Sequence, residues 1–486
     1  MTIAPYWEDG QVTLYLGDCL AVMREMPDAS VDAVVTDPPA AIRFMGRSWD
    51  GDRGGRDRWI AWLAERMAEA LRVLKPGGHA LVWALPRTSG WTQMALEDAG
   101  FEVRDCIVHI FGSGFPKSLD VSAAIDKAAG AVREVIAEGV PVRRMIPGAD
   151  QNRTGSWIKD NGREFVPTET IPATEDAACW QGWGTALKPG QEIWWLARKP
   201  LAGTVASNVL AYGTGALNIA GCRVQGGSRP ARSNEASASG LTGTGGATAY
   251  GSYAVRGSVA AGETSEGRWP PNIVLTHSAG CEPKGTRKVR NRSGSVSADV
   301  PSRPVDVIFG DCERVGWRAH GAADGLESVE AWDCAADCPV AELDRQSGRT
   351  SGGNRPARRG GIGYGSGAGG TSDGVAISYD SGGASRFFPG FRYQAKAPAS
   401  ERPRGEDGTA HETVKSLGLM RWLVRLITPG GGVVLDCFAG SGTTAEACIV
   451  EGFGCVLIDD EQPHADLIRV RLSKAIQPVL FGLEES

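Results

Sequence analysis

Hydrophobic and polar positions alternate in a regular way along the first part of this chain. Short apolar runs predict buried strands at residues 12–16, 31–36, 79–84 and 102–110. Apolar side chains at helical spacing predict a helix over 58–74, and a second helix is expected near 90–99. Strands that alternate with helices are typical of a doubly wound α/β sheet.

The same alternation returns near the C-terminus. We predict helices at 415–428 and 443–452, and strands at 432–436 and 454–458. A parallel sheet with right-handed crossovers holds both halves only if the late strands dock beside the early ones. The sequence therefore predicts one discontinuous domain, interrupted by a large excursion.

Two of these strands run into loops of unusual composition. The strand at 31–36 precedes Asp37-Pro-Pro-Ala40, in which two prolines hold an acid rigid. The strand at 432–436 ends at Asp436 and precedes Phe438-Ala-Gly-Ser-Gly442, a turn of small residues before a helix. In such turns glycine lets the backbone approach a nucleotide-like ligand. A further strand ends at Asp459, where an acid suits ribose hydroxyls.

At these residues the chain resembles the amino-methylating DNA methyltransferases, which transfer a methyl group from S-adenosylmethionine to the exocyclic nitrogen of adenine or cytosine. The catalytic loop precedes the cofactor loop, which is similar to the order in the family's β class. The resemblance implies a Rossmann-like S-adenosylmethionine-dependent methyltransferase fold with circularly permuted motifs and a large inserted target-recognition domain. It also implies site residues. The catalytic set is Asp37, Pro38, Pro39 and Ala40. The cofactor set is Asp18, Thr413, Lys415, Asp436, Phe438, Ala439, Gly440, Ser441, Gly442 and Asp459.

The resemblance assigns a part to each stretch of the chain. Residues 1–130 would form the catalytic half of the methyltransferase domain, and 399–486 its cofactor-binding half. Residues 131–215 would be an insertion that returns to the sheet, with an irregular stretch from 131 to 190. Residues 216–398, Gly-rich and basic, would be the target-recognition region.

The chemistry explains the Asp-Pro-Pro loop. The lone pair of an exocyclic amine is delocalised into the ring, so both amino hydrogens must be held while the nitrogen becomes pyramidal. By analogy with the family, the Asp37 carboxylate accepts one hydrogen bond and the Pro38 carbonyl accepts the other. The base must first be flipped out of the duplex. Asp at the first motif position favours adenine N6, with cytosine N4 as the alternative.

The chain departs from the family pattern in two places. Ala40 stands where an aromatic side chain normally stacks on the flipped base, and Phe44 and Trp49 are candidates to replace it or are core residues. Glu412 and Ser416 stand where the cofactor loop usually has prolines. These departures leave open the alternative that the chain is a DNA-binding protein with the methyltransferase fold and little or no catalytic activity. Asp18 has its own alternative, a helix cap.

Charge and cysteines add two hypotheses for the middle of the chain. The net charge of −6 is acidic, yet basic segments lie at 284–292 and 345–359. They predict phosphate contacts, with solvated surface loops as the alternative. The DNA-binding candidates are Arg287, Lys288, Arg290, Arg292, Arg355, Arg358 and Arg359.

A structural zinc site is the second hypothesis. His277-x-x-x-Cys281 and Cys334-x-x-x-Cys338 could converge as four ligands, and unliganded buried thiols are the alternative, since the chain has 11 cysteines.

Composition places the chain among globular proteins. The hydrophobic content of 42% allows substantial cores, and the sequence has no apolar run of membrane-spanning length and no charged-then-apolar leader. We expect a cytoplasmic location with reduced thiols. Expected partners are double-stranded DNA, a second copy of the chain and a cognate restriction enzyme, with no membrane.

Overall fold

The computed structural model describes residues 3–473, apart from the segments 44–48, 113–117, 144–163, 225–228, 233–246, 249–250, 253–259, 265–266, 279, 291–325, 337, 349–382 and 392–413. The chain forms two compact units. The terminal unit comprises Met1–Ala216 together with Ala395–Ser486, and the central unit comprises Leu217–Gln394.

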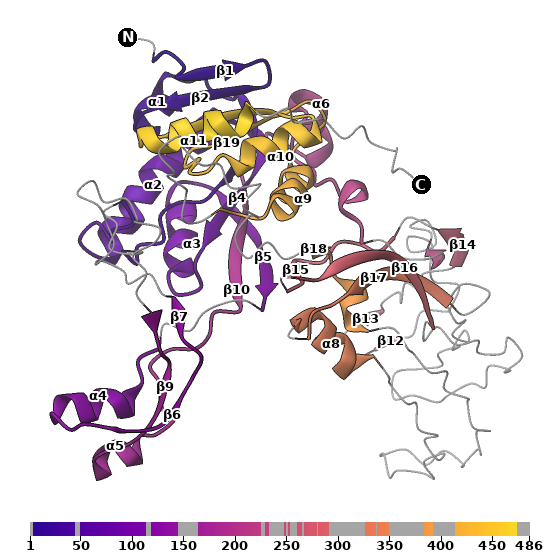
Figure 1. Ribbon diagram of the computed structural model, residues 1–486. Helices are drawn as coiled ribbons and strands as arrows, with labels where there is room; N and C mark the ends of the chain where they lie inside the picture. Colours follow the sequence, from indigo (N-terminus) through magenta and orange to yellow (C-terminus); the bar gives the residue numbers. More distant parts are fainter. Residues whose placement is uncertain are drawn as a thin grey trace, which may run out of the picture. The chain divides into compact units, whose positions relative to one another are not determined.

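One twisted sheet forms the centre of the terminal unit (Figure 1). Its strand order is β1-β2-β20-β19-β3-β4-β10-β5. The strands are β1 (Trp7–Asp9), β2 (Val12–Leu16), β3 (Val31–Thr36), β4 (Leu74–Ala84), β5 (Glu102–Phe111), β10 (Gln191–Arg198), β19 (Val433–Asp436) and β20 (Gly454–Asp459). The pairs from β2 to β4 are parallel, whereas β10 runs antiparallel to both of its neighbours.

The sheet joins the two ends of the chain. Strand β19 lies between β3 and β20, and β20 pairs in turn with β2. Strand β3 is buried at all six positions, as expected of a parallel strand covered on both faces. The predicted Rossmann-like α/β fold is confirmed by this topology.

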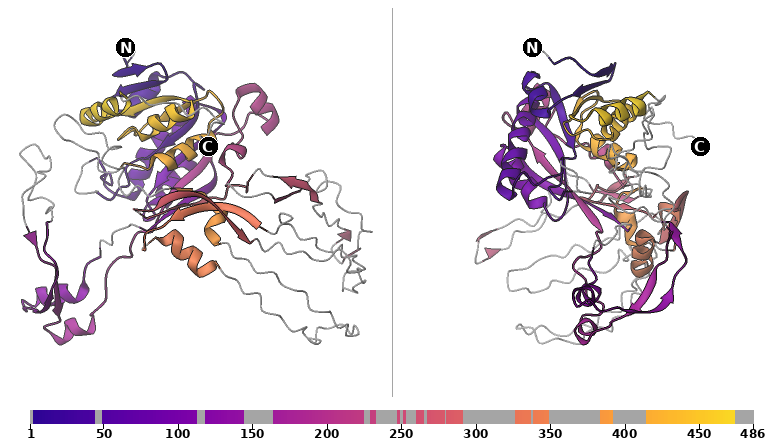
Figure 2. Two further views of the ribbon diagram at one scale, coloured as in Figure 1. Left: turned by 45° about the vertical axis from the view of Figure 1, so that its right-hand side comes forward. Right: turned by 60° about the vertical axis from the view of Figure 1, so that its left-hand side comes forward.

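Helices cover both faces of the sheet (Figure 2, right). On one face lie α1 (Cys19–Glu25), α2 (Arg56–Val73) and α3 (Ser89–Asp98), and on the other lie α9 (Leu417–Ile427), α10 (Thr443–Glu451) and α11 (Gln462–Leu472). The core beneath the first group contains Val34, Leu63 and Met67, all fully buried. On the second face the buried Glu451 carboxylate binds Arg421 and Arg425 at 2.7 and 2.6 Å, which joins α9 to α10.

Strand β4 begins earlier than the sequence predicts. The sequence predicts a strand at 79–84, but the strand starts at Leu74 and includes Lys75-Pro-Gly-Gly78. Leu74 pairs with Val31, and the Lys75 ammonium lies 2.6 Å from the Asp32 carboxylate. These contacts extend the pairing of β4 with β3 to the segment that contains Pro76 and Gly77.

The expected irregular stretch 131–190 contains regular structure. Its elements, with the helix that precedes it, are α4 (Val121–Ala128), β6 (Glu134–Glu138), β7 (Val142–Arg143), β8 (Glu164–Phe165), β9 (Thr168–Ile171) and α5 (Glu175–Cys179). Strands β6 and β9 form an antiparallel ribbon. The buried Asp126 carboxylate accepts hydrogen bonds from Ala173 and Thr174 and contacts Arg133 at 3.2 Å, which ties α4 to the start of α5. The chain then reaches β10 and α6 (Val205–Tyr212).

The central unit is built from short pairings. Strand β15 (Ile273–Thr276) is parallel to β18 (Gly390–Phe391), and β16 (Glu282–Arg290) is antiparallel to β17 (Leu326–Asp333). The remaining elements are η2 (Ala220–Cys222), β11 (Arg229–Arg232), β12 (Ala247–Thr248), β13 (Gly251–Ser252), β14 (Ala260–Thr264), α8 (Pro339–Ser347) and η3 (Ala384–Phe387). Among the helices that the structure describes, none has the length and apolar character to cross a bilayer.

We predict that Asp32→Ala destabilises the terminal unit. The Asp32 carboxylate accepts a hydrogen bond from the Val433 N–H at 2.8 Å and binds Lys75, so its loss leaves both groups without this acceptor. We expect the free energy of unfolding to fall by about 2–4 kcal/mol, measured by urea denaturation. Asp57→Ala, at an exposed position on α2, is the matched control and should change it by less than about 0.5 kcal/mol. Equal losses in the two variants would contradict the bridging role of Asp32.

Candidate active site

The predicted catalytic loop, residues 37–40, follows β3 at the carboxyl edge of the sheet. Pro38 is buried, and the Asp37 side chain keeps 26% of its surface exposed. Polar contacts fix the loop on both sides. Thr88 donates a hydrogen bond to the Ala40 carbonyl at 2.9 Å, and the buried Asp50 carboxylate accepts one from the Ala41 N–H at 2.9 Å. Ala41 has a φ of 61°, so the Asp50 contact holds a backbone conformation that costs free energy.

A cation from the C-terminal half of the chain contacts Asp37, the predicted catalytic acid. The Lys415 ammonium lies 2.7 Å from Asp37 Oδ2 and 3.9 Å from the ring centroid of Trp83. The Trp83 indole N–H donates a hydrogen bond to Glu192 at 2.7 Å, and the second oxygen of Glu192 lies 2.8 Å from His109 Nδ1. Residues from the ends of β4, β5 and β10 thus support the Asp37–Lys415 pair.

Burial and charge act in opposite directions on this group. Burial raises the pKa of Asp37 above its ordinary value, and the Lys415 ammonium opposes the shift. Burial alone would lower the pKa of Lys415, but the carboxylates of Asp37 and Glu192 outweigh it and raise the pKa. Burial also opposes ionisation of Glu192, yet Lys415 and His109 lower its pKa to about 2. The Lys415 ammonium thus interacts with the carboxyl groups of both Asp37 and Glu192.

The small-residue turn is held by two acids that end parallel strands. Asp436 accepts hydrogen bonds from Thr36 at 2.7 Å and Thr444 at 2.5 Å, and the Asp459 carboxylate accepts one from the Gly440 N–H at 2.7 Å. Gly442 has a φ of 73°, and a Cβ there would lie 3.0 Å from Ile468. The turn therefore requires glycine at that position.

Asp459 and Asp18 both make protein contacts at this edge. The Asp459 carboxylate also accepts the Glu461 N–H at 3.0 Å and contacts His464. Asp18 caps α1 by accepting the Ala21 N–H at 3.1 Å. Asp18 thus caps a helix, as the alternative interpretation of this residue predicts. The cofactor-binding roles of Asp18 and Asp459 stay predictions.

The rest of the predicted cofactor set lies around the turn. The Phe438 ring packs against Trp62 with the ring centroids 5.8 Å apart, Ala439 and Ser441 are buried, and Arg471 donates to the Ser441 carbonyl at 3.1 Å. Thr413 lies outside the described residues. Ser416, one of the departures from the family pattern, is the N-cap of α9 and accepts the Leu419 N–H.

The sequence reasoning missed several residues of this site. Trp83, Glu192, Thr36 and Thr444 make contacts that no motif indicated. A usable signal existed for Trp83, because it lies at the end of a predicted strand, where parallel sheets carry their ligands. Of the two aromatic candidates, Phe44 lies outside the described residues, and Trp49 is half-buried.

In the central unit the structure brings four predicted metal ligands together. The ligand atoms of His277, Cys281, Cys334 and Cys338 all lie within 4.8 Å of one another. Of the predicted DNA-binding residues, Arg287 and Lys288 lie exposed on β16, which also includes Arg290. Arg292, Arg355, Arg358 and Arg359 lie outside the described residues.

A mostly parallel α/β sheet with an acidic, proline-fixed loop and a glycine turn at one edge is an arrangement that suits a nucleotide-like ligand. Residues 31–120 and 381–469 match the family profile described as DNA methylase. The chain is 32% identical over 85 residues to the type II methyltransferase M.BamHI of Bacillus amyloliquefaciens, which covers 18% of this chain and 20% of the relative. It is 41% identical over 72 residues to the DNA adenine methyltransferase YhdJ of Escherichia coli (strain K12), covering 14% and 24%.

The solved PvuII DNA methyltransferase (cytosine-N4-specific) aligns over 97% of this chain and 89% of its own, with 10% identity and a TM-score of 0.38. The fold is defined by the strand topology described above. The aligned segments span only about a fifth to a quarter of the two curated relatives. The match over residues 31–120 and 381–469 supports the predicted resemblance to the amino-methylating DNA methyltransferases.

We predict a pH-dependent stability term from Asp436. Burial raises its pKa to about 6, partly opposed by the Thr444 and Thr36 hydroxyls. The folded state then binds the proton more tightly than the unfolded state, so this contribution is present at low pH and is lost as pH rises through about 6. Compared with Asp436→Asn, the wild-type free energy of unfolding should fall by about 2–3 kcal/mol between about pH 4 and pH 7. A difference that is constant across this range in urea titrations would contradict the prediction.

Proposed function

We propose that this chain is an S-adenosylmethionine-dependent DNA methyltransferase that methylates the exocyclic amine of a flipped base in duplex DNA, with adenine N6 preferred and cytosine N4 as the alternative. One observation carries the proposal. Asp37 and the Pro38 carbonyl lie in a fixed loop after β3, and the Gly440–Gly442 turn follows the adjacent strand β19.

The turn suits the proposed cofactor. Its backbone is fixed by Asp459, its Gly442 position admits no Cβ without displacing Ile468, and α10 begins directly after it. Asp459 and Asp436 would hold the ribose and methionine ends, as the family motif implies. The bound cofactor supplies the electrophilic methyl group.

The loop residues would act on the target amine. Lys415 contacts Asp37 Oδ2, which leaves Oδ1 to accept one amino hydrogen, and the Pro38 carbonyl accepts the other. Both acceptors favour a pyramidal nitrogen with its lone pair directed at the methyl carbon. After transfer the nitrogen carries an extra proton, and the Asp37 carboxylate, whose pKa burial raises, is placed to receive it.

We further propose that Trp83 replaces the aromatic residue absent at position 40. Its indole contacts Glu192 and Lys415, and Lys415 lies 2.7 Å from Asp37, so a half-buried ring lies near the Asp37 carboxylate. A ring fixed in this way loses little conformational freedom when a base stacks on it.

Partners complete the proposal. Double-stranded DNA is the substrate, and self-association and a cognate restriction enzyme are the further partners proposed. Light scattering of the purified chain and co-purification from its native host test these two.

The first experiment asks whether the chain transfers methyl groups. Purified protein is incubated with isotopically labelled S-adenosylmethionine and mixed-sequence duplex DNA, and the nucleosides are identified by mass spectrometry. We expect labelled N6-methyladenine, and Asp37→Asn should lower kcat by about 10²- to 10³-fold with cofactor affinity retained. Because the carboxylate must be ionised, wild-type kcat should fall with decreasing pH, at a pH above the ordinary pKa range of aspartate. Absence of label despite binding of cofactor and duplex would favour the non-catalytic DNA-binding alternative.

The stacking role of Trp83 predicts a graded mutant series. Trp83→Phe keeps an aromatic ring and should retain most activity, whereas Trp83→Ala should lower kcat/KM by about 5- to 150-fold, equivalent to about 1–3 kcal/mol. Fluorescence of a 2-aminopurine at the target position reports base flipping in each variant. Trp49→Ala is the matched control, and a larger loss there than in Trp83→Ala would assign the platform to Trp49.

A further inference from the structure

A compact group of one histidine and three cysteines lies in the central unit. His277 follows β15, Cys281 precedes β16, Cys334 follows β17, and Cys338 is the N-cap residue of α8. Three of the four are buried, with 4%, 0% and 1% of their surfaces exposed for His277, Cys281 and Cys338. Two stretches of chain, one carrying His277 and Cys281 and the other Cys334 and Cys338, therefore converge on one point.

The distances within the group fit a tetrahedral metal. His277 Nδ1 lies 3.4 Å from Cys334 Sγ and 3.6 Å from Cys338 Sγ. A zinc ion with ordinary Zn–S and Zn–N bond lengths places a sulfur and a nitrogen ligand about 3.6 Å apart. The Ala335 N–H points to Cys281 Sγ at 3.3 Å, a contact that stabilises a thiolate.

We propose that this group binds one structural Zn²⁺ through His277 Nδ1 and the three thiolates. Three sulfurs and an imidazole nitrogen are ligands that select zinc, and four protein ligands complete its coordination. A disulfide explains the arrangement less well, since it would use two of the three sulfurs and leave the third thiol and the imidazole without a reason to converge. All three cysteines are free thiols in the structure.

The metal would join both strands of the β16–β17 ribbon at one end. Glu282 pairs with Asp333, and these residues directly follow Cys281 and directly precede Cys334. An isolated two-stranded ribbon is marginally stable in water, so a metal at its open end would contribute much of its order.

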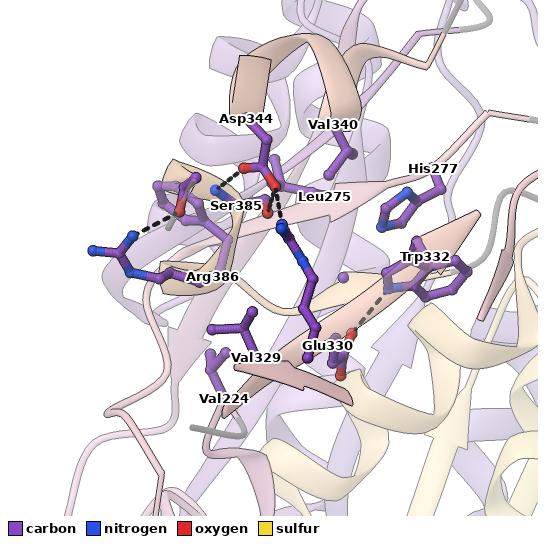
Figure 3. A pocket seen from close by; sticks show the side chains of 14 residues that line it. Val224, Leu275, His277, Val329, Glu330, Trp332, Val340, Asp344, Ser385 and Arg386 are labelled. Carbon is purple, nitrogen blue, oxygen red and sulfur yellow. Dashed lines mark hydrogen bonds and ion pairs between the residues drawn. The ribbon is translucent and has the colours of Figure 1, made fainter. Parts of the chain in front are cut away.

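Side-chain contacts also join the β16–β17 ribbon to α8 (Figure 3). The His277 ring stacks on Trp332 with the centroids 4.0 Å apart. Asp344 of α8 accepts hydrogen bonds from the Ser385 N–H and hydroxyl, each at 2.8 Å, and pairs with Arg287 of β16 at 3.7 Å. The ribbon and α8 therefore form one body around the metal group.

This arrangement points to a role in holding duplex DNA, a step that rests on the proposed function. Lys284, Arg287 and Lys288 lie on the exposed part of β16. A two-stranded ribbon fits the major groove, and cations held in a fixed register contact phosphates at less entropic cost than cations on a free loop. The zinc would thus fix the strand that carries Lys284, Arg287 and Lys288, and it would take no part in methyl transfer.

The metal site is tested on the full-length chain, independently of activity. Elemental analysis of protein purified without added chelator should give one zinc per chain. Replacement by Co²⁺ should give thiolate-to-cobalt charge-transfer absorption and the d–d bands of a tetrahedral site. Absence of zinc, together with octahedral or no cobalt binding, would overturn the proposal even if the protein methylates DNA.

Variants then test the ligands and the ribbon separately. Cys281→Ser and Cys338→Ser should lose the zinc, while Cys222→Ser, at a buried cysteine of the same unit outside the group, should keep it. Zinc loss should weaken binding of mixed-sequence duplex about tenfold or more, with S-adenosylmethionine affinity within about twofold of wild type. Zinc retained in both ligand variants would overturn the site. Zinc lost with unchanged duplex affinity would overturn the ribbon's role and leave the proposed methyl transfer untouched.

Discussion

The pairing of β3 with β19 is the contact on which the active site depends. These strands come from opposite ends of the chain, and a buried carboxylate joins them at each end of the pair. Asp32 accepts the Val433 N–H where β19 begins, and Asp436 accepts the Thr36 hydroxyl, 400 residues away in sequence, where the strands end. Because the predicted catalytic loop and the glycine turn each follow one of these strands, this register brings them together.

The same junction sets the electrostatics of the site. Lys415 comes from the segment before α9, so it reaches Asp37 only when the C-terminal half has docked. Its ammonium then neutralises part of the charge of Asp37 and Glu192, two acids that would otherwise repel each other in a poorly solvated place. Folding of the discontinuous domain and assembly of a usable carboxylate are therefore one event.

The sequence predicted the strands, the helices around them and the order of the two loops, because these depend on local apolar patterns and on glycine and proline. It predicted less where the local structure depends on a residue that is distant in the sequence. Strand β4 begins at Leu74 because Val31 and Asp32 bind there, and the ribbon of β6 and β9 is tied by Asp126, none of which a local pattern contains. Trp83 and Glu192 were missed for the same reason, since their roles come from a cross-strand neighbour. The convergence of His277 with three cysteines was foreseeable only because ligand spacing is itself a local signal.

The departure at Ala40 is understandable from how the loop is held. Thr88 binds the carbonyl of residue 40, and Asp50 binds the N–H of residue 41, so the backbone of the loop is fixed by groups that every residue type possesses. The side chain at position 40 is therefore not needed to keep Asp37 and the Pro38 carbonyl in place. In the proposed mechanism, the acceptor geometry and the stacking surface are separate requirements. The loop and its contacts with Thr88 and Asp50 supply the acceptor geometry. The stacking surface can come from any aromatic ring fixed nearby. The contacts of Trp83 with Glu192 and Lys415 fix its indole in such a position.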